Sequence, residues 1–265
     1  MSEPRERSVV VGGERCRVWE KGSGEPLGFL GGVRGLPRWT PFLDRLAERR
    51  RVVAPSLPGF PGAEGHQRLD DVADWVTATL DLLEASGLEG ADLVGASVGG
   101  LLAAEVAAFS HASLRRLVLI APFGLFDADE PVADLWAQRT DDVPALLSAR
   151  PERLAAALAP PAGEDHGEWA LVLHRASEAA ARLLWPLGDL GLAKRLHRVR
   201  TPTLLVWGSD DRLIPASYAK RFAAAVSGWV EIRQIEGAGH VAEIDAPDAV
   251  ADAVLPFLAG SRAGA

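Results

Sequence analysis

The sequence has little cysteine, no long apolar run and no excess of positive charge. Because Cys16 is its only cysteine, an intrachain disulfide bond is excluded, and we expect this thiol to be a small buried side chain within a strand. The 28 basic and 36 acidic residues give a net charge of −8, which argues against nucleic acid or an anionic membrane as the main partner. Residues 1–7 are charged and no apolar run follows them. We therefore expect no signal peptide, no membrane span and a cytoplasmic location.

The chain alternates apolar, strand-like runs with amphipathic helical stretches. Its 265 residues and its hydrophobic content of 48% fit one large domain that carries an inserted segment. Strands are predicted at 9–11, 16–19, 26–30, 51–54, 117–120, 203–207 and 229–235, with another that ends at 92–94. Helices are predicted at 41–49, 69–86, 98–109 and 247–258, and one more between 207 and 229. The alternation predicts a mostly parallel sheet that is covered by helices on both faces.

Residues 123–199 interrupt this alternation, because they contain no convincing strand. Helical stretches are predicted there at 132–139, 143–150, 152–158 and 168–184. We interpret this segment as a helical cap, inserted between two parts of one core, residues 1–122 and 200–265. The cap is rich in Leu, Ala and Trp, which suits an apolar ligand.

One strand-to-helix junction carries the pattern Gly-x-Ser-x-Gly, at Gly95-Ala96-Ser97-Val98-Gly99. In a nucleophile elbow this pattern forms a tight turn, which holds the serine in a strained conformation and exposes its hydroxyl group. Gly95 and Gly99 lack a Cβ atom, so the helix can pass close to the strand. The amide of Val98, at the start of the helix, then points to where an anion is stabilised.

Two later motifs follow predicted strands directly and supply partners for this serine. The first contains Asp210 and Asp211, followed by Arg212-Leu213-Ile214-Pro215, and the second ends at His240. Loops beyond the strand ends are where α/β sheets bind ligands. A serine hydroxyl is a weak nucleophile until an imidazole takes its proton, and a buried carboxylate stabilises the imidazolium that forms. Ser97, His240 and one of the two aspartates are therefore a candidate catalytic triad.

With these motifs, nearly the whole chain resembles the α/β-hydrolase fold superfamily, in the branch that carries a helical cap. The resemblance implies a mostly parallel eight-stranded sheet covered by helices. It also implies that Ser97 is the nucleophile, His240 the base and Asp211 the acid, with Asp210 as the alternative acid. No metal or cofactor is implied.

The resemblance extends to an oxyanion hole, formed by the backbone N–H groups of Val98 and Val33. The loop before Val33 reads Gly31-Gly32, where relatives usually have His-Gly. The donors are backbone groups, so the chemistry does not require the histidine. Its absence predicts a more mobile loop.

A serine nucleophile disfavours haloalkane dehalogenases and epoxide hydrolases of this fold, which need an aspartate. We predict hydrolysis of a small, largely apolar carboxylic ester or thioester. The alternative is a carbon–carbon bond hydrolase of the meta-cleavage type, because residues 183–197 resemble those enzymes at the end of the cap. Val241 stands where they often carry tryptophan, which weakens this alternative. A third hypothesis, a catalytically silent binding protein, conflicts with an intact triad.

The expected partner is a small-molecule substrate. We expect the cap to cover Ser97 and to form most of the pocket wall. Candidate substrate contacts, given by their position near the expected site or in the cap, are Gly32, Arg34, Trp136, Trp185 and Val241.

Overall fold

A computed structural model describes residues 3–110 and 113–260 of the chain. Eight strands form one sheet in the order β1-β2-β4-β3-β5-β6-β7-β8. The strands are β1 (Arg5–Val11), β2 (Glu14–Lys21), β3 (Pro26–Leu30), β4 (Arg51–Pro55), β5 (Ala91–Ala96), β6 (Leu114–Ile120), β7 (Thr203–Gly208) and β8 (Val230–Ile235). The β1-β2 and β2-β4 pairs are antiparallel, and the remaining neighbours are parallel. The eight-stranded, mostly parallel sheet predicted from the sequence is confirmed.

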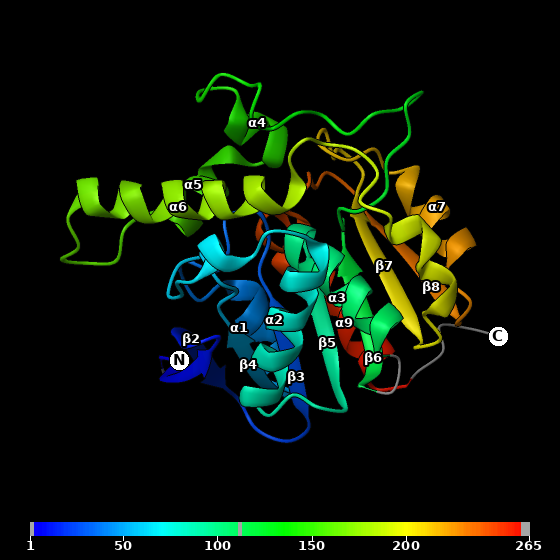
Figure 1. The fold of residues 1–265 in the computed structure, drawn as a ribbon, viewed down its shortest axis with the longest axis horizontal. Coiled ribbons are helices and arrows are strands. Elements are labelled where there is room, and N and C mark those ends of the chain that lie inside the picture. Colours follow the sequence, from blue (N-terminus) through cyan, green and yellow to red (C-terminus); the bar gives the residue numbers. More distant parts are fainter. Residues whose placement is uncertain (1–2, 111–112, 261–265) are drawn as a thin grey trace.

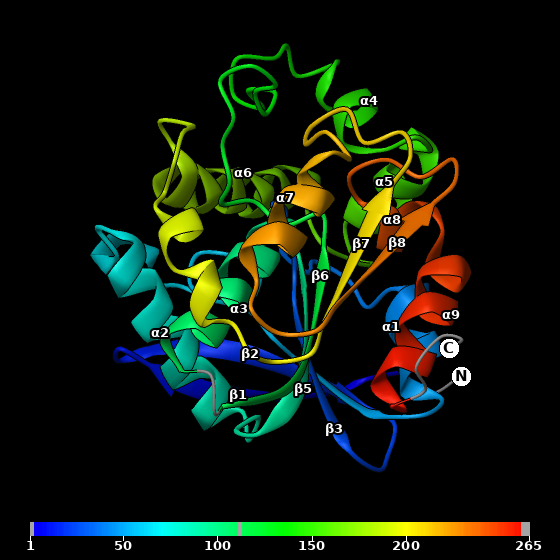
Figure 2. The same ribbon diagram turned by 90° about the vertical axis from the view of Figure 1, so that its right-hand side faces the viewer.

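Helices cover both faces of the sheet, which explains why every residue of the central strands β5 and β7 is buried. The core helices are α1 (Pro41–Ala47), α2 (Val72–Ala85), α3 (Ser97–Phe109), α7 (Tyr218–Ala225), α8 (Ala242–Asp245) and α9 (Pro247–Leu258). Helices α1 and α9 pack on one face, and α2 and α3 on the other (Figure 2). Each face therefore has its own apolar core, and Cys16 lies buried in β2 as predicted.

Helix α2 shows how the local sequence produces these elements. The side chain of Asp71 caps it by accepting a hydrogen bond of 3.0 Å from the N–H of Asp74. Its apolar residues recur at helical spacing, so Trp75, Val76 and Leu82 lie buried on one side. Gly87, just beyond the C-cap, takes the left-handed conformation that commonly ends a helix.

The helical part of the segment 123–199 lies beyond the carboxyl ends of the strands (Figure 1), and its last residues pass α3 on the way to the start of β7. It contains α4 (Val143–Leu147), α5 (Pro151–Leu158) and α6 (His166–Leu184), and no strand among these described residues. Short 3-10 helices occur here at Leu192–Lys194 and Leu196–Arg198, and in the core at His66–Arg68. We keep the word cap for residues 123–199.

The prediction of a helix at 132–139 is wrong, because this stretch has no regular secondary structure and bends at 135–138. The carboxylate of Asp134 accepts the backbone N–H groups of Trp136 at 2.8 Å and Ala137 at 3.1 Å. Such local bonds offer the backbone an alternative to a helix.

Among the helices of residues 3–110 and 113–260, none combines the length and apolar character needed to cross a membrane.

Candidate active site

Ser97 lies at the sharp turn between β5 and α3, with a positive φ of 53°. A non-glycine residue in this region is strained, and such strain occurs at functional sites. A Cβ atom on Gly95 would lie 2.4 Å from the carbonyl oxygen of Gly99, and one on Gly99 would lie 2.4 Å from that of Leu30. Both positions therefore require glycine, and together they let the turn carry the serine at the strand end.

Ser97, His240 and Asp211 form one continuous hydrogen-bonded chain. The Nε2 atom of His240 lies 2.8 Å from the Ser97 hydroxyl oxygen, and its Nδ1 atom lies 3.0 Å from Oδ2 of Asp211. The His240 and Asp211 side chains are fully buried, and Ser97 is 2% exposed. With Nδ1–H donating to the carboxylate, Nε2 is free to accept the serine proton.

The two neighbouring aspartates differ in their surroundings. Oδ1 of Asp211 accepts the backbone N–H groups of Leu213 and Ile214, each at 2.9 Å, which orient the carboxylate toward His240. Asp210 is exposed, and its carboxylate accepts the hydroxyl group of Ser209. The structure thus brings Asp211, and not Asp210, to the imidazole.

The loop after β3 lies beside the serine. A Cβ atom on Gly32 would lie 3.2 Å from Cβ of Ser97 and 3.8 Å from its hydroxyl oxygen. Backbone bonds fix this loop, because Gly99 N–H donates to Gly31 O at 3.1 Å and Gly35 N–H donates to Gly32 O at 2.7 Å. A histidine side chain at position 31 is therefore not needed to hold the loop.

Two backbone N–H groups are available as donors for an oxyanion next to Ser97, those of Val98 and Val33. Val98 is in the first turn of α3, where N–H groups have no partner within the helix. The Val33 N–H makes no backbone hydrogen bond in the described part of the chain. Val98 follows Ser97 in the chain and Val33 follows Gly32, which lies beside Ser97, so both N–H groups remain candidates for the oxyanion hole.

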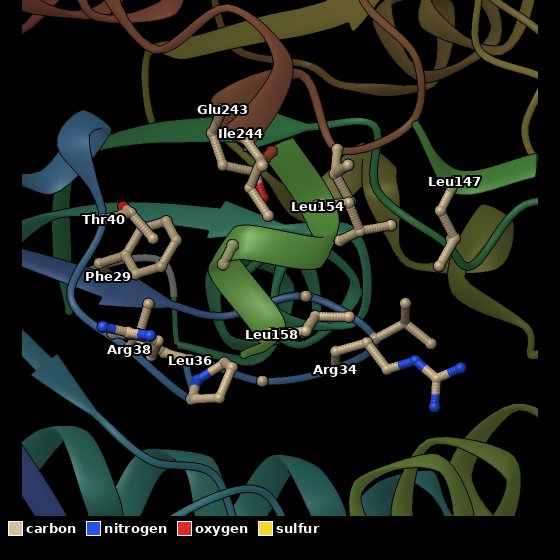
Figure 3. Close-up of a pocket in the computed structure, with 16 residues that line it drawn as sticks. Phe29, Arg34, Leu36, Arg38, Thr40, Leu147, Leu154, Leu158, Glu243 and Ile244 are labelled. Carbon is tan, nitrogen blue, oxygen red and sulfur yellow. The ribbon is translucent and has the colours of Figure 1, made fainter. Parts of the chain in front are cut away.

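A small pocket is lined by Gly32 and Val33 of the loop beside Ser97 and by Val241, which follows His240. Figure 3 shows the side chains that line it. Its apolar wall consists of Phe29, Leu36, Leu147, Leu154, Leu158 and Ile244. The free volume is about 30 Å³, enough for about two water molecules. In this conformation the pocket is nearly filled by its own side chains.

The cap contributes less to this pocket than expected. It supplies Leu147 from α4 and Leu154, Ala157 and Leu158 from α5, so four of the 16 lining residues come from the cap. The others belong to β3, to the loop after it and to the segment around α8. The expectation that the cap forms most of the wall is not met for this pocket, because 12 of its 16 lining residues come from the core.

The five candidate substrate contacts divide into two groups. Gly32, Arg34 and Val241 line the pocket. Trp136 and Trp185 do not line it. Their rings meet edge to face with centroids 6.5 Å apart, and Trp185 is 56% exposed.

Burial lowers the pKa of Arg34, whose Nε atom has no hydrogen-bond partner in the described chain.

Sequence reasoning missed Glu243, which lines the pocket from α8. Its side chain is buried, and this burial raises the pKa of the carboxyl group to about 7, in part against the attraction of His240. An acidic residue in an otherwise apolar stretch after His240 was the available signal.

No cluster of metal-ligating side chains occurs within residues 3–110 and 113–260.

The comparisons with known proteins agree with this architecture. The profile of the Alpha/beta hydrolase family matches residues 29–253. A dihydrolipoyllysine-residue acetyltransferase component of the acetoin cleaving system of Pseudomonas putida is 31% identical over 279 residues, covering 96% of this chain and 70% of that protein. A 2-hydroxymuconate semialdehyde hydrolase of Pseudomonas sp. (strain CF600) is 28% identical over 280 residues, covering 98% and 95%.

Among solved structures, a meta-cleavage product hydrolase from Pseudomonas fluorescens IP01 superposes with a TM-score of 0.76. The alignment covers 97% of this chain and 98% of the other, at 17% identity. At this identity the likeness concerns the fold, which includes the arrangement of the strands and the covering helices.

Proposed function

Because this chain belongs to the alpha/beta hydrolase family, we propose that it is a serine hydrolase acting on a small, largely apolar carboxylic ester or thioester. One observation carries the proposal: the buried chain from Ser97 Oγ through the His240 imidazole to Asp211, with donor–acceptor distances of 2.8 and 3.0 Å. In this geometry, one imidazole takes the serine proton while the carboxylate fixes its tautomer.

The proposed reaction proceeds through an acyl-enzyme. Nε2 of His240 accepts the proton of Ser97 as its oxygen bonds to the substrate carbonyl carbon. The oxyanion that forms accepts hydrogen bonds from the N–H groups of Val33 and Val98. His240 then gives the proton to the leaving oxygen or sulfur atom, and the bond to the leaving group breaks. A water molecule repeats the sequence on the acyl-enzyme, which releases the acid and restores Ser97.

The pocket supports a compact apolar substrate. Its wall is dominated by leucine, isoleucine and phenylalanine side chains, so burying an alkyl or aryl group there is favourable. Its small free volume limits the occupant to a short group unless α5 moves outward. A small molecule is therefore the proposed partner.

Carbon–carbon bond cleavage is the second candidate. Several relatives are named as hydrolases of this kind, among them the 2-hydroxymuconate semialdehyde hydrolase. A carbon leaving group needs a substrate that acts as an electron sink, with polar contacts to its dienol and carboxylate. Arg34 lines the pocket and would supply one such contact.

The decisive experiment compares the two substrates under steady-state conditions. We expect kcat/KM for short-chain 4-nitrophenyl esters to exceed that for 2-hydroxymuconate semialdehyde at least ~10-fold, a difference of about 1.4 kcal/mol in transition-state stabilisation. Efficient cleavage of the dienoate with negligible ester hydrolysis would reverse the ranking.

Ser97→Ala provides the matched control. We expect a loss on the order of 10⁴- to 10⁶-fold in rate, with an unchanged thermal melt, and no labelling by a fluorophosphonate. If the variant keeps more than a tenth of the activity, Ser97 is not the nucleophile. If the unmodified protein neither hydrolyses a substrate nor reacts with the probe, a silent binding protein is the better interpretation.

A further inference from the structure

Glu243 lines the pocket from α8, three residues after His240 (Figure 3). The residue is 6% exposed, and its carboxyl group interacts with its own backbone N–H. The carboxyl oxygen Oε2 is buried and has no hydrogen-bond partner in the described chain. A buried polar atom without a partner is costly, so a ligand in the pocket that supplied one would gain affinity.

The surroundings of Glu243 do not otherwise compensate for its burial. Phe29, Leu154 and Ile244 line the same pocket as Glu243, and their side chains are apolar. Asp245 already accepts bonds from Ser148 and from two backbone N–H groups, and it offers no donor when ionised. The remaining polar or charged residues that line the pocket are Thr40, Arg34 and Arg38.

We propose that Glu243 is a specificity-determining residue that hydrogen-bonds a hydroxyl group of the substrate. The preferred substrate is then an ester whose acyl or alcohol part carries a hydroxyl group that reaches Oε2. This inference rests on the hydrolase function proposed above, because the pocket begins at the candidate oxyanion loop and at the residue that follows His240.

The charges around the pocket favour a hydroxyl over charged alternatives. Arg34 and Arg38 would repel a substrate ammonium group. They would attract a substrate carboxylate, but one placed against Oε2 would be repelled by Glu243 in its ionised form. A hydroxyl group both donates and accepts hydrogen bonds. It therefore pairs with the carboxyl group in either protonation state, which matters because burial raises the pKa of Glu243 to about 7.

The test uses size-matched ester pairs, so that only the hydroxyl group changes. For the acyl part, 4-nitrophenyl 3-hydroxybutanoate is compared with 4-nitrophenyl 3-methylbutanoate. For the alcohol part, 3-hydroxypropyl butanoate is compared with butyl butanoate. We expect the unmodified protein to prefer the hydroxyl member of one pair by about 3- to 10-fold in kcat/KM, as one hydrogen bond to a buried group provides. The pair that shows the preference identifies the part of the ester that enters the pocket.

Variants connect this preference to Glu243. Glu243→Leu removes the hydrogen bond, so the ratio should fall to about one, whereas Glu243→Gln keeps a polar partner and should retain part of the preference. Glu236→Leu removes an exposed glutamate from the loop after β8 and should leave the ratio unchanged. Thermal melts establish that each variant is folded. A ratio that Glu243→Leu leaves unchanged, or a preference for the methyl or butyl member in both pairs, would overturn the inference.

Binding to Ser97→Ala separates this inference from the hydrolase function. Calorimetric titration of the same esters into Ser97→Ala, with and without Glu243→Leu, measures recognition without turnover. A hydroxyl preference in affinity that disappears with Glu243→Leu supports the inference even if the unmodified protein proves inactive. Hydrolysis by the unmodified protein without any such preference would refute the inference alone.

Discussion

The ring of Phe123 meets the imidazole of His240 edge to face, with centroids 5.6 Å apart and planes inclined by 65°. Phe123 is 3% exposed, and its N–H donates to the carbonyl oxygen of Ser97 at 3.3 Å. The first residue of the cap is thus attached to the turn that carries the serine while its side chain packs against the candidate base.

This contact predicts an effect on activity at Phe123. Phe123→Leu keeps an apolar side chain but loses the aromatic pair, which is worth about 1 kcal/mol. We expect kcat/KM for a 4-nitrophenyl ester to fall about 3- to 10-fold. Phe126→Leu, which changes a phenylalanine that is 39% exposed, should have no effect. Equal activity in the two variants would show that the ring does not position the imidazole.

The different environments of Asp211 and Asp210 predict unequal mutational effects. Asp211→Asn should reduce kcat by about 10³-fold or more, because the amide no longer stabilises the imidazolium or fixes its tautomer. Asp210→Asn should cost far less, since that side chain is exposed and contacts Ser209. Steady-state rates of the two variants decide the matter, and the reverse order would move the acid to Asp210.

The close approach of β5 and α3 predicts a large cost for a methyl group at Gly95. A Cβ atom there would lie 2.4 Å from the Gly99 carbonyl oxygen, so Gly95→Ala should lower the free energy of unfolding by ~3 kcal/mol or abolish folding. Gly188→Ala is the matched control, because its Cβ atom would meet nothing closer than 3.9 Å. Urea titrations measure both; similar midpoints would contradict the packing argument.

The buried carboxyl group of Glu243 predicts a pH-dependent stability. Desolvation raises its pKa from 4.5 to about 7 in the folded state, helped by the repulsion of Asp245 and opposed by its own backbone N–H and by the attraction of His240. Arg34 and Arg38 line the same pocket. Between these two pH values the folded state holds more protons than the unfolded state, so stability falls as the pH rises. The loss amounts to at most about 3 kcal/mol.

Glu243→Gln removes this titration. The variant should therefore gain stability relative to the unmodified protein as the pH increases from 5 to 8, measured by urea unfolding at each pH. Asp245 and His240 remain in both proteins, so the difference isolates Glu243. A difference between the proteins that is constant over this range would show that the carboxyl group keeps its ordinary pKa.

Much of the fold could be predicted because the signals are local. Continuous apolar runs between turn residues identified the parallel strands, and the Gly-x-Ser-x-Gly pattern located the turn at Ser97. Strand ends also indicated the loops of Asp211 and His240, which the structure brings together at the carboxyl edge of the sheet.

The pocket could not be predicted in the same way. It depends on how the loop after β3 and α8 pack against α5, and these segments are far apart in the sequence. Glu243 therefore gave no recognisable motif. The helix predicted at 132–139 failed for a local reason. The side chain of Asp134 accepts two backbone N–H groups and so favours a non-helical backbone.

Asp245 joins the cap to the histidine loop. Its carboxylate accepts the N–H of Gly239 at 2.7 Å and that of Ala149 at 2.9 Å, as well as the hydroxyl group of Ser148. The Val241 N–H also donates to Leu147 O at 3.0 Å. The end of α4 and the base therefore form one mechanical unit. A hinged lid that swung α4 outward would carry His240 away from Ser97, so the route for substrate entry and product exit must open without moving that anchor.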